Sequence, residues 1–305
     1  MAVTRADVER AADRIGGYVL RTPVIEVEPG RWLKLECLQH AGSFKVRGAF
    51  NRLLGATPPA AGVLSASGGN HGLAVAFAAR RLGVRAEIFV PEVCAPVKIA
   101  GLRALGAEVV VGGAIYQEAL EASWKRAAET GAVEIHAYDQ LDVAAGQGTV
   151  ALELLDQLGQ VDTVVVAVGG GGLVAGIVAG LDGRAQVIAV EPERIPTLHR
   201  ALAAGEPVRV EVSGVGADAL GASMLGRIPY ETVAGRVTSV LVSDEAIVEA
   251  RHALWHEHHI AVEHAGAAAL AALRGGAYTP APGERVAVIV CGSNTDPATL
   301  AVTRR

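Results

Sequence analysis

Short apolar runs alternate with longer amphipathic segments along most of the chain. The apolar runs are rich in β-branched residues, which is typical of buried parallel strands. They predict strands at residues 63–67, 85–90, 107–111, 162–168, 186–190, 239–242 and 285–291. The segments between them carry apolar residues at helical spacing and predict helices at residues 71–82, 95–105, 116–130, 146–158, 173–181, 244–258 and 264–273. This alternation predicts an α/β fold with parallel sheets.

The same pattern bears on domains and on membranes. No repeat, low-complexity tract or long linker divides the chain, so we expect a smaller domain at residues 61–140, with residues 1–60 and 141–305 forming the larger one. Residues 163–181 carry no charge and contain glycines at the GxxxG spacing of membrane helices. Because the first half is β-branched and four glycines interrupt it, a buried strand, loop and helix explain it better, and no membrane partner is expected.

Composition narrows the class of protein. Of the 305 residues, 51% are hydrophobic and 19% charged, which excludes an intrinsically disordered chain. A net charge of −5 does not indicate a protein that binds nucleic acid. The N-terminal segment is charged, lacks the apolar stretch of a signal peptide, and predicts an amphipathic helix. Cys37, Cys94 and Cys291 form no CxxC pair or disulfide framework, so a reducing, cytoplasmic location is expected.

Four consecutive glycines, Gly169, Gly170, Gly171 and Gly172, follow a predicted strand and open a predicted helix. Free N–H groups and the helix dipole favour an anion there, and glycine lets the backbone approach phosphate oxygens closely. A tight turn alone would need fewer glycines, so phosphate binding is favoured. The Gly-x-Gly-x-x-Ala pattern that begins at Gly170, with Glu191 ending the next strand, also fits a dinucleotide fingerprint. An NAD-dependent oxidoreductase is therefore an alternative.

Two further clusters indicate an aldehyde and a small anion. Lys45 stands within residues 42–48 (GSFKVRG), between an aromatic and an apolar side chain. Burial would lower the pKa of its amine, and a neutral amine can form a Schiff base; an exposed turn lysine is the alternative. The turn at residues 67–72 (SGGNHG) offers small polar groups that suit a carboxylate, or that only cap a helix. One cofactor, pyridoxal 5'-phosphate, combines a phosphate with an aldehyde.

At these residues the chain resembles the fold-type II pyridoxal-phosphate enzymes, and it is most similar to the serine/threonine dehydratase (threonine deaminase) and serine racemase group. The resemblance runs from residue 21 to residue 294 and includes GQGT at 146–149 and CGSN at 291–294. It implies the tryptophan synthase β-like fold, with two three-layer domains rich in parallel strands. It also implies that the smaller domain is mobile and lies on the substrate side, and that the protein is a homodimer.

The resemblance implies a role for each candidate site residue. Lys45 would form the Schiff base with the cofactor and later act on the Cα proton of the substrate. Phe44 would pack beside the pyridine ring, the four glycines would cradle the phosphate, and Asn70 would bond the phenolic oxygen. Cys291 would face the pyridine nitrogen. The substrate carboxylate would be surrounded by Ser67, Gly68, Asn70 and His71.

Two positions favour elimination over racemisation. A neutral thiol at Cys291 cannot stabilise a pyridinium as a carboxylate would, so the ring is a weaker electron sink. Racemases of the group carry a second serine as an acid/base where this chain has Gly68, which has no proton to give. The hypothesis is therefore an ammonia-lyase that converts L-threonine to 2-oxobutanoate and L-serine to pyruvate. A serine racemase, a dehydratase for a bulkier β-hydroxy amino acid and a non-catalytic amino-acid sensor are alternatives.

The resemblance also implies a cation site near the phosphate loop. Its ligands would be Glu191, the backbone carbonyl of Ile195 and the side chain of Thr197. Members that use a divalent ion have aspartate where Thr197 stands, so a monovalent cation such as potassium is expected. Glu263 is similar in position to a family glutamate near the cofactor and is a candidate for an indirect role. No effector-binding module follows residue 305, so we expect no feedback control through one.

Overall fold

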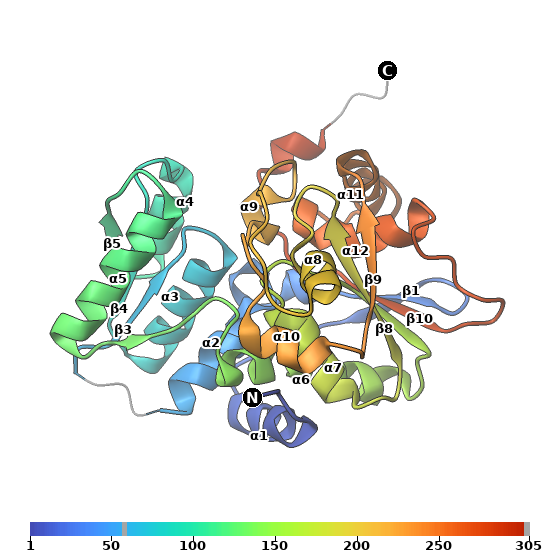
Figure 1. The fold of residues 1–305 in the computed structure, drawn as a ribbon, viewed down its shortest axis with the longest axis horizontal. Coiled ribbons are helices and arrows are strands. Elements are labelled where there is room, and N and C mark those ends of the chain that lie inside the picture. Colours follow the sequence, from blue (N-terminus) through green and yellow to red (C-terminus); the bar gives the residue numbers. More distant parts are fainter. Residues whose placement is uncertain (57–59, 302–305) are drawn as a thin grey trace.

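The computed structural model describes residues 1–56 and 60–301, and their strands form two separate sheets (Figure 1). The larger sheet has six strands in the order β1-β2-β10-β7-β8-β9. They are β1 (Val24–Glu28), β2 (Arg31–Lys34), β7 (Thr163–Ala167), β8 (Gln186–Pro192), β9 (Thr238–Val242) and β10 (Val286–Ile289). Strands β1 and β2 pair antiparallel at one edge, and the described strands after them pair in parallel.

The smaller sheet has four parallel strands in the order β5-β4-β3-β6. They are β3 (Val63–Ala66), β4 (Ala86–Val90), β5 (Glu108–Val111) and β6 (Val133–Glu134). Three helices connect these strands and surround the sheet on the left of Figure 1, namely α3 (Asn70–Leu82), α4 (Pro96–Ala104) and α5 (Tyr116–Thr130). This sheet lies within residues 61–140, where the sequence predicts a smaller domain.

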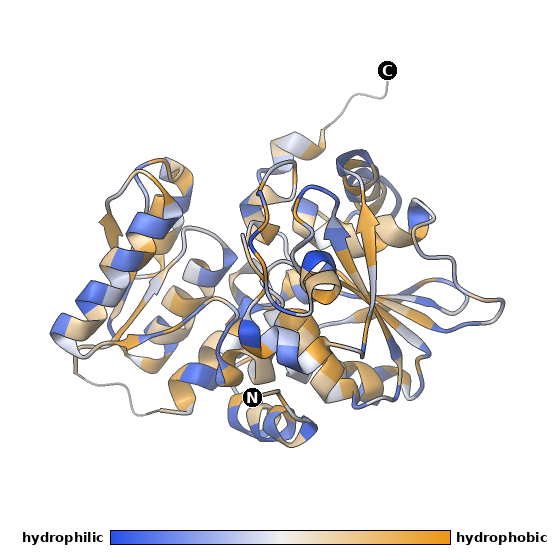
Figure 2. Ribbon diagram, viewed as in Figure 1, coloured by the Kyte–Doolittle hydropathy of each residue, from blue (hydrophilic) through white to orange (hydrophobic). Residues whose placement is uncertain are grey.

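The remaining helices come from the residues outside 61–140. They are α1 (Arg5–Ile15), α2 (Lys45–Leu54), α6 (Leu141–Leu158), α7 (Gly172–Leu181), α8 (Thr197–Ala204), α9 (Ala217–Leu220), α10 (Arg227–Val233), α11 (Asp244–His258) and α12 (His264–Arg274), with 3₁₀ turns η1 (Glu36–Leu38), η2 (His40–Gly42) and η3 (Pro297–Leu300). Strands β7 and β10 are buried along their whole length, and α12 packs against them. Figure 2 shows the apolar residues of these strands gathered in the centre of the sheet. The continuous apolar runs are therefore strands buried between layers, as the sequence predicts.

Helices α6 and α7 pack closely because glycines face each other between them. A Cβ on Gly176 would lie 2.3 Å from the carbonyl oxygen of Ala144 and 2.4 Å from the nitrogen of Gly148. A Cβ on Gly180 would lie 2.7 Å from the carbonyl oxygen of Gly148. The GxxxG spacing thus serves helix packing within the fold, where only glycine permits this approach. Within residues 1–56 and 60–301, no helix has the length and apolar character needed to cross a membrane.

The predicted α/β fold with parallel sheets is confirmed, and α5 and α11 agree with their predictions at both ends. Ser243 caps α11 by accepting a hydrogen bond from the backbone nitrogen of Ala246 at 3.2 Å. Helix α6 begins five residues earlier than predicted. Gly146 therefore lies inside the helix. Glycine fits at this position because a Cβ would lie 2.6 Å from the carbonyl oxygen of Arg47 on α2. The antiparallel hairpin of β1 and β2, and helices α2 and α8 to α10, were not predicted.

Candidate active site

Two motifs that are far apart in the sequence meet at the start of α2. Ser43 forms an antiparallel bridge with Gly292. The backbone N–H of Phe44 donates to the carbonyl oxygen of Cys291 at 3.2 Å. These contacts hold the segment before α2 against the chain that leaves β10. As a result Lys45, the first residue of α2, lies beside the carboxyl end of the larger sheet.

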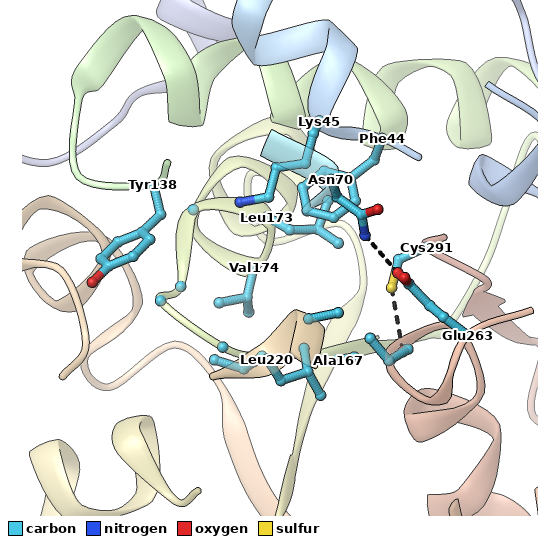
Figure 3. A pocket seen from close by; sticks show the side chains of 17 residues that line it. Phe44, Lys45, Asn70, Tyr138, Ala167, Leu173, Val174, Leu220, Glu263 and Cys291 are labelled. Atoms are coloured by element: carbon cyan, nitrogen blue, oxygen red, sulfur yellow. Dashed lines mark hydrogen bonds between the residues drawn. The ribbon is translucent and has the colours of Figure 1, made fainter. Parts of the chain in front are cut away.

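The side chain of Lys45 points into a cavity lined by residues from both parts of the molecule (Figure 3). Its Nζ donates a hydrogen bond to the carbonyl oxygen of Ala137 at 2.7 Å and lies 5.3 Å from the centre of the Phe44 ring. Burial lowers the pKa of this amine to about 8. A substantial neutral fraction is therefore available near physiological pH, which attack on a carbonyl requires. The alternative of an exposed turn lysine is wrong.

The four glycines line the same cavity, and Figure 3 shows their loop running past the amine of Lys45. The backbone N–H groups of Gly169 to Gly172 donate no hydrogen bond to any acceptor within residues 1–56 and 60–301. The loop leads into α7, a helix of 10 residues whose dipole is positive at this end. Free N–H donors at the start of a helix are the donor set that phosphate oxygens require. The residues present therefore fit a phosphate group.

Protein packing also requires these glycines. A Cβ on Gly170 would lie 2.2 Å from the ring of Tyr138, and a Cβ on Gly171 would lie 2.6 Å from the side chain of Leu225. Gly171 also has a φ of +93°, a conformation that favours glycine. Packing thus accounts for glycine at two of the four positions, which leaves open the expectation that a tight turn alone needs fewer than four glycines. The free N–H groups, rather than the number of glycines, are the observation that points to an anion.

The turn before α3 contributes one of its predicted side chains to the cavity. Asn70 lines the cavity, whereas Ser67, Gly68 and His71 lie outside its lining. The ring of His71 is buried and its Nε2 lies 2.8 Å from the carbonyl oxygen of Ile135. Burial lowers the pKa of His71 to about 3, so the ring is neutral. Of the four residues predicted to surround the substrate carboxylate, Asn70 is the one that lines this cavity.

Cys291 and Glu263 line one side of the cavity (Figure 3). The Sγ of Cys291 donates to the carbonyl oxygen of Ala265 at 3.3 Å, and burial raises the pKa of the thiol, which stays protonated. The carboxylate of Glu263 accepts a hydrogen bond from Nδ2 of Asn70 at 2.6 Å. Burial raises the pKa of Glu263 to about 7. The sequence suggested only an indirect role for Glu263, yet its side chain lines the cavity.

Sequence reasoning missed Tyr138. Its ring packs on the glycine loop, and its hydroxyl donates to the carbonyl oxygen of Met224 at 3.3 Å. The residue stands in a tight turn, in which the backbone nitrogens of Tyr138 and Asp139 donate to Nδ1 of His136 at 3.2 and 2.9 Å. The run His-Ala-Tyr-Asp between a strand and a helix could have indicated the turn, but not its contact with the glycines.

The predicted cation ligands lie behind the glycine loop. The hydroxyl of Thr197 lies 2.7 Å from the carbonyl oxygen of Gly169 and 2.9 Å from Oε1 of Glu191. Glu191 is fully buried and accepts hydrogen bonds from the backbone nitrogens of Leu198 at 2.7 Å and His199 at 2.8 Å. Burial raises the pKa of Glu191 to about 7. Because this carboxylate caps α8 inside the protein, it does not have the place that a dinucleotide fingerprint gives a ribose-binding acid.

Comparisons with known proteins agree on one family. The family model described as "Pyridoxal-phosphate dependent enzyme" matches residues 15–292. The L-threonine ammonia-lyase of Thermotoga maritima is 36% identical, over 96% of this chain and 76% of the relative. The phenylserine dehydratase of Ralstonia pickettii is 38% identical, over 94% of this chain and 92% of the relative. The structure of maize serine racemase is similar with a TM-score of 0.92 at 32% identity, covering 98% of this chain and 96% of that one.

Proposed function

The chain belongs to the pyridoxal-phosphate dependent enzymes, and from this premise we propose that it is a dehydratase and ammonia-lyase of small β-hydroxy amino acids. L-Threonine gives 2-oxobutanoate and ammonia, and L-serine gives pyruvate and ammonia. One observation carries the proposal: the Lys45 amine shares a cavity with the free N–H groups of the glycine loop and the protonated thiol of Cys291. The similarity to an L-threonine ammonia-lyase supports the choice of substrate.

The residues of the cavity fit pyridoxal phosphate. Lys45 would hold the cofactor through Nζ, and the N–H groups of the glycine loop would bind its phosphate oxygens. Phe44 would pack beside the pyridine ring, Asn70 would donate an N–H to the phenolic oxygen, and Cys291 would face the ring nitrogen. When bound, the cofactor draws electrons from the Cα of the substrate and makes the Cα proton acidic.

With substrate bound, the amine of Lys45 would act as the base. Its pKa of about 8 allows the neutral amine to accept the Cα proton. Nζ takes the proton from Cα, and the electron pair left behind forms a double bond between Cα and Cβ. The Cβ–O bond breaks and its electron pair leaves with the hydroxyl. The departing hydroxyl takes up one proton and leaves as water, while Nζ of Lys45 takes up one proton from Cα, so the number of protons held in the site is unchanged. The unsaturated amine then loses ammonia in water to give the keto acid.

Cys291 biases the reaction toward elimination. Burial raises the pKa of its thiol, so the group that would face the ring nitrogen is neutral. A neutral thiol gives no Coulomb stabilisation to a positive ring nitrogen, so a carbanion at Cα gains less from the ring. Expulsion of a β-hydroxyl uses that electron pair at once, whereas racemisation must preserve it until a second proton arrives. Gly68 supplies no side chain to deliver that proton.

Lys45→Ala tests the proposal. We expect loss of the protein-bound visible absorbance and of ammonia release from both L-threonine and L-serine. Lys125→Ala is the matched control, because the Lys125 side chain is 80% exposed and carries only an i,i+4 ion pair. Borohydride reduction followed by peptide mass analysis should place the cofactor on residue 45. A Lys45→Ala enzyme that keeps its absorbance and its turnover overturns the assignment.

The bulkier substrate is the second candidate, because a phenylserine dehydratase is 38% identical to the chain. Measuring kcat/KM for L-threonine, L-serine and phenylserine on one preparation ranks the three. Chiral analysis of recovered serine detects racemisation. A ligand-dependent spectral change without ammonia release would instead indicate an amino-acid sensor.

We further propose that Glu191, the carbonyl of Ile195 and the side chain of Thr197 hold a monovalent cation such as potassium. Support comes from a buried carboxylate with no cationic side chain among its described hydrogen-bond partners. Thr197 also contacts the carbonyl oxygen of Gly169, so a cation there would stiffen the phosphate loop. If the site binds potassium, the thermal midpoint of the wild type should be higher in potassium chloride than in tetramethylammonium chloride. The Glu191→Gln variant should have the same thermal midpoint in both salts.

We also propose that residues 61–140 move as a smaller domain and that the protein is a cytoplasmic homodimer. The separate four-stranded sheet supports the domain, and three unpaired thiols support a reducing location. Light scattering after gel filtration tests the dimer. A smaller radius of gyration in small-angle scattering with substrate present tests the domain movement.

A further inference from the structure

Asn70 is held by a different partner at each end of its side-chain amide. Its Nδ2 donates to Oε1 of Glu263 at 2.6 Å, and its Oδ1 accepts from Nδ2 of Asn294 at 2.6 Å (Figure 3 shows the first contact). An amide nitrogen carries two hydrogens, so one N–H of Asn70 remains for the cavity that this residue lines. The two contacts therefore decide whether the cavity meets an N–H donor or a carbonyl oxygen.

The direction of this chain of hydrogen bonds is fixed at both ends. Nδ2 of Asn294 also donates to the backbone carbonyl oxygen of Ala41 at 2.8 Å, and a backbone carbonyl can only accept. At the other end, an ionised Glu263 can only accept. Turning the Asn70 amide over would place its oxygen against the carboxylate and its N–H groups against those of Asn294. Each misplaced contact would leave buried polar groups without partners.

Two glycines make room for the partners of Asn70. A Cβ on Gly42 would lie 2.5 Å from Oδ1 of Asn294, and a Cβ on Gly292 would lie 2.2 Å from Oε1 of Glu263. Both glycines stand in motifs that the sequence marked for other reasons, next to Lys45 and Cys291. Glycine at these two positions thus leaves space for the network, and Gly42 also has a φ of +74°, which favours glycine.

We infer that Glu263 and Asn294 are positioning residues that orient the Asn70 amide, so that it presents an N–H to the phenolic oxygen of the cofactor. The inference rests on the proposed function and names two residues that act through a third. Asn70 begins α3 beside the smaller sheet, whereas Glu263 precedes α12 and Asn294 follows β10. The network thus joins the two parts of the molecule, and the amide is oriented only while α3 lies against the larger part.

Asn294→Asp tests the inference, because it replaces the donor facing Asn70 by an acceptor of the same shape. With a carboxylate on each side, the Asn70 amide is no longer held in one orientation, and its N–H is no longer fixed toward the cavity. We expect the Kd for pyridoxal phosphate to rise about tenfold or more, as for loss of one hydrogen bond to a charged group. The absorption maximum of the resting holoenzyme should shift as well. Measurement at pH 8 keeps Glu263 ionised, since its pKa is about 7.

The double variant Glu263→Gln with Asn294→Asp separates orientation from stability. Its glutamine can donate to the turned Oδ1 of Asn70 while the aspartate accepts from Nδ2, so the network closes in the opposite direction. We expect it to regain part of the thermal midpoint lost in Asn294→Asp but to keep the raised Kd and the shifted absorption maximum. Recovery of all three together would overturn the inference and indicate a structural role.

Asn51→Asp is the matched control. Asn51 is a buried amide on α2 that bonds Arg14 and the carbonyl oxygen of Asp142, away from the cavity lining. We expect it to lower the thermal midpoint and leave the Kd and the absorption maximum of the holoenzyme unchanged. If Asn294→Asp also binds pyridoxal phosphate and absorbs as the wild type does, the positioning role is wrong. A wild-type protein that takes up no cofactor at Lys45 would refute the proposed function instead.

Discussion

Replacing Arg47 with methionine should destabilise the protein far more than loss of a surface ion pair. The guanidinium of Arg47 is fully buried and pairs with both carboxylate oxygens of Glu36, at 2.8 and 2.8 Å. It pairs in the same way with Glu153, at 2.7 and 2.9 Å. Lys34 completes the cluster by donating to Glu153 at 2.7 Å. Two cations thus balance two anions in the interior.

The magnitude follows from what the substitution leaves behind. Without Arg47, the fully buried carboxylate of Glu36 retains one hydrogen bond within the described part of the chain, from the hydroxyl of Thr22. Two carboxylates then face the single ammonium of Lys34. Removing one partner of a buried ion pair costs about 3–5 kcal/mol, because a charge is left without compensation. For a chain of this size we expect the thermal midpoint to fall by roughly 10 °C.

Urea unfolding followed by circular dichroism measures the change in the free energy of unfolding. Arg227→Met is the control, because Arg227 forms an i,i+4 pair with Glu231 and its side chain is 82% exposed; we expect a loss of about 0.5 kcal/mol or less. Arg47→Lys should fall between the two, since an ammonium cannot form both two-point pairs. An Arg47→Met protein within about 1 kcal/mol of the wild type would refute the reasoning.

Three further predictions concern the amine, the buried carboxylate and the helix contact. The rate at which apoenzyme takes up pyridoxal phosphate should rise with pH and level off above about 8, the pKa of Lys45, whereas a flat profile would contradict the lowered pKa. Burial raises the pKa of Glu191 from 4.5 to about 7, so between these pH values the folded chain keeps a proton that the unfolded chain loses. Without potassium, the free energy of unfolding should therefore fall as the pH rises from 4.5 to 7. In urea titrations, Glu191→Gln should flatten this pH dependence. Gly176→Val should lower the thermal midpoint, since its Cβ would lie 2.3 Å from the carbonyl oxygen of Ala144, and an unchanged midpoint would show that α6 and α7 can separate at little cost.

The parts of the site that were predictable follow the ends of parallel strands. The glycine loop follows β7, Cys291 lies just beyond β10, and Asn70 comes shortly after β3. Ligands of α/β proteins collect where such strands end, so motifs at these positions are expected to meet. Lys45 is not of this kind, because it begins a helix. It was found because its neighbours in residues 42–48 carry a pattern of their own.

The parts that were not predictable depend on contacts between distant segments. Glu263 is a single acid at the N-cap of α12, and nothing around it in the sequence marks burial. Tyr138 stands in a turn whose contact with Gly170 arises only when β6 and α7 are in place. The β1–β2 hairpin is short, and Gly30, with a φ of +74°, is its main local signal. Local patterns predict elements, but they do not predict which loop will face which.

The glycine loop shows why a motif alone underdetermines a site. Close packing against Tyr138 and Leu225 requires glycine at positions 170 and 171, and anion binding requires the same residue type. A substitution such as Gly170→Ala would therefore fail for either reason and could not tell them apart. The N–H groups that find no acceptor among the described residues separate the two explanations, because packing has no need of them, whereas a phosphate does. Accounting for backbone donors, rather than counting glycines, is thus the observation that turns this loop from a turn into a candidate binding site.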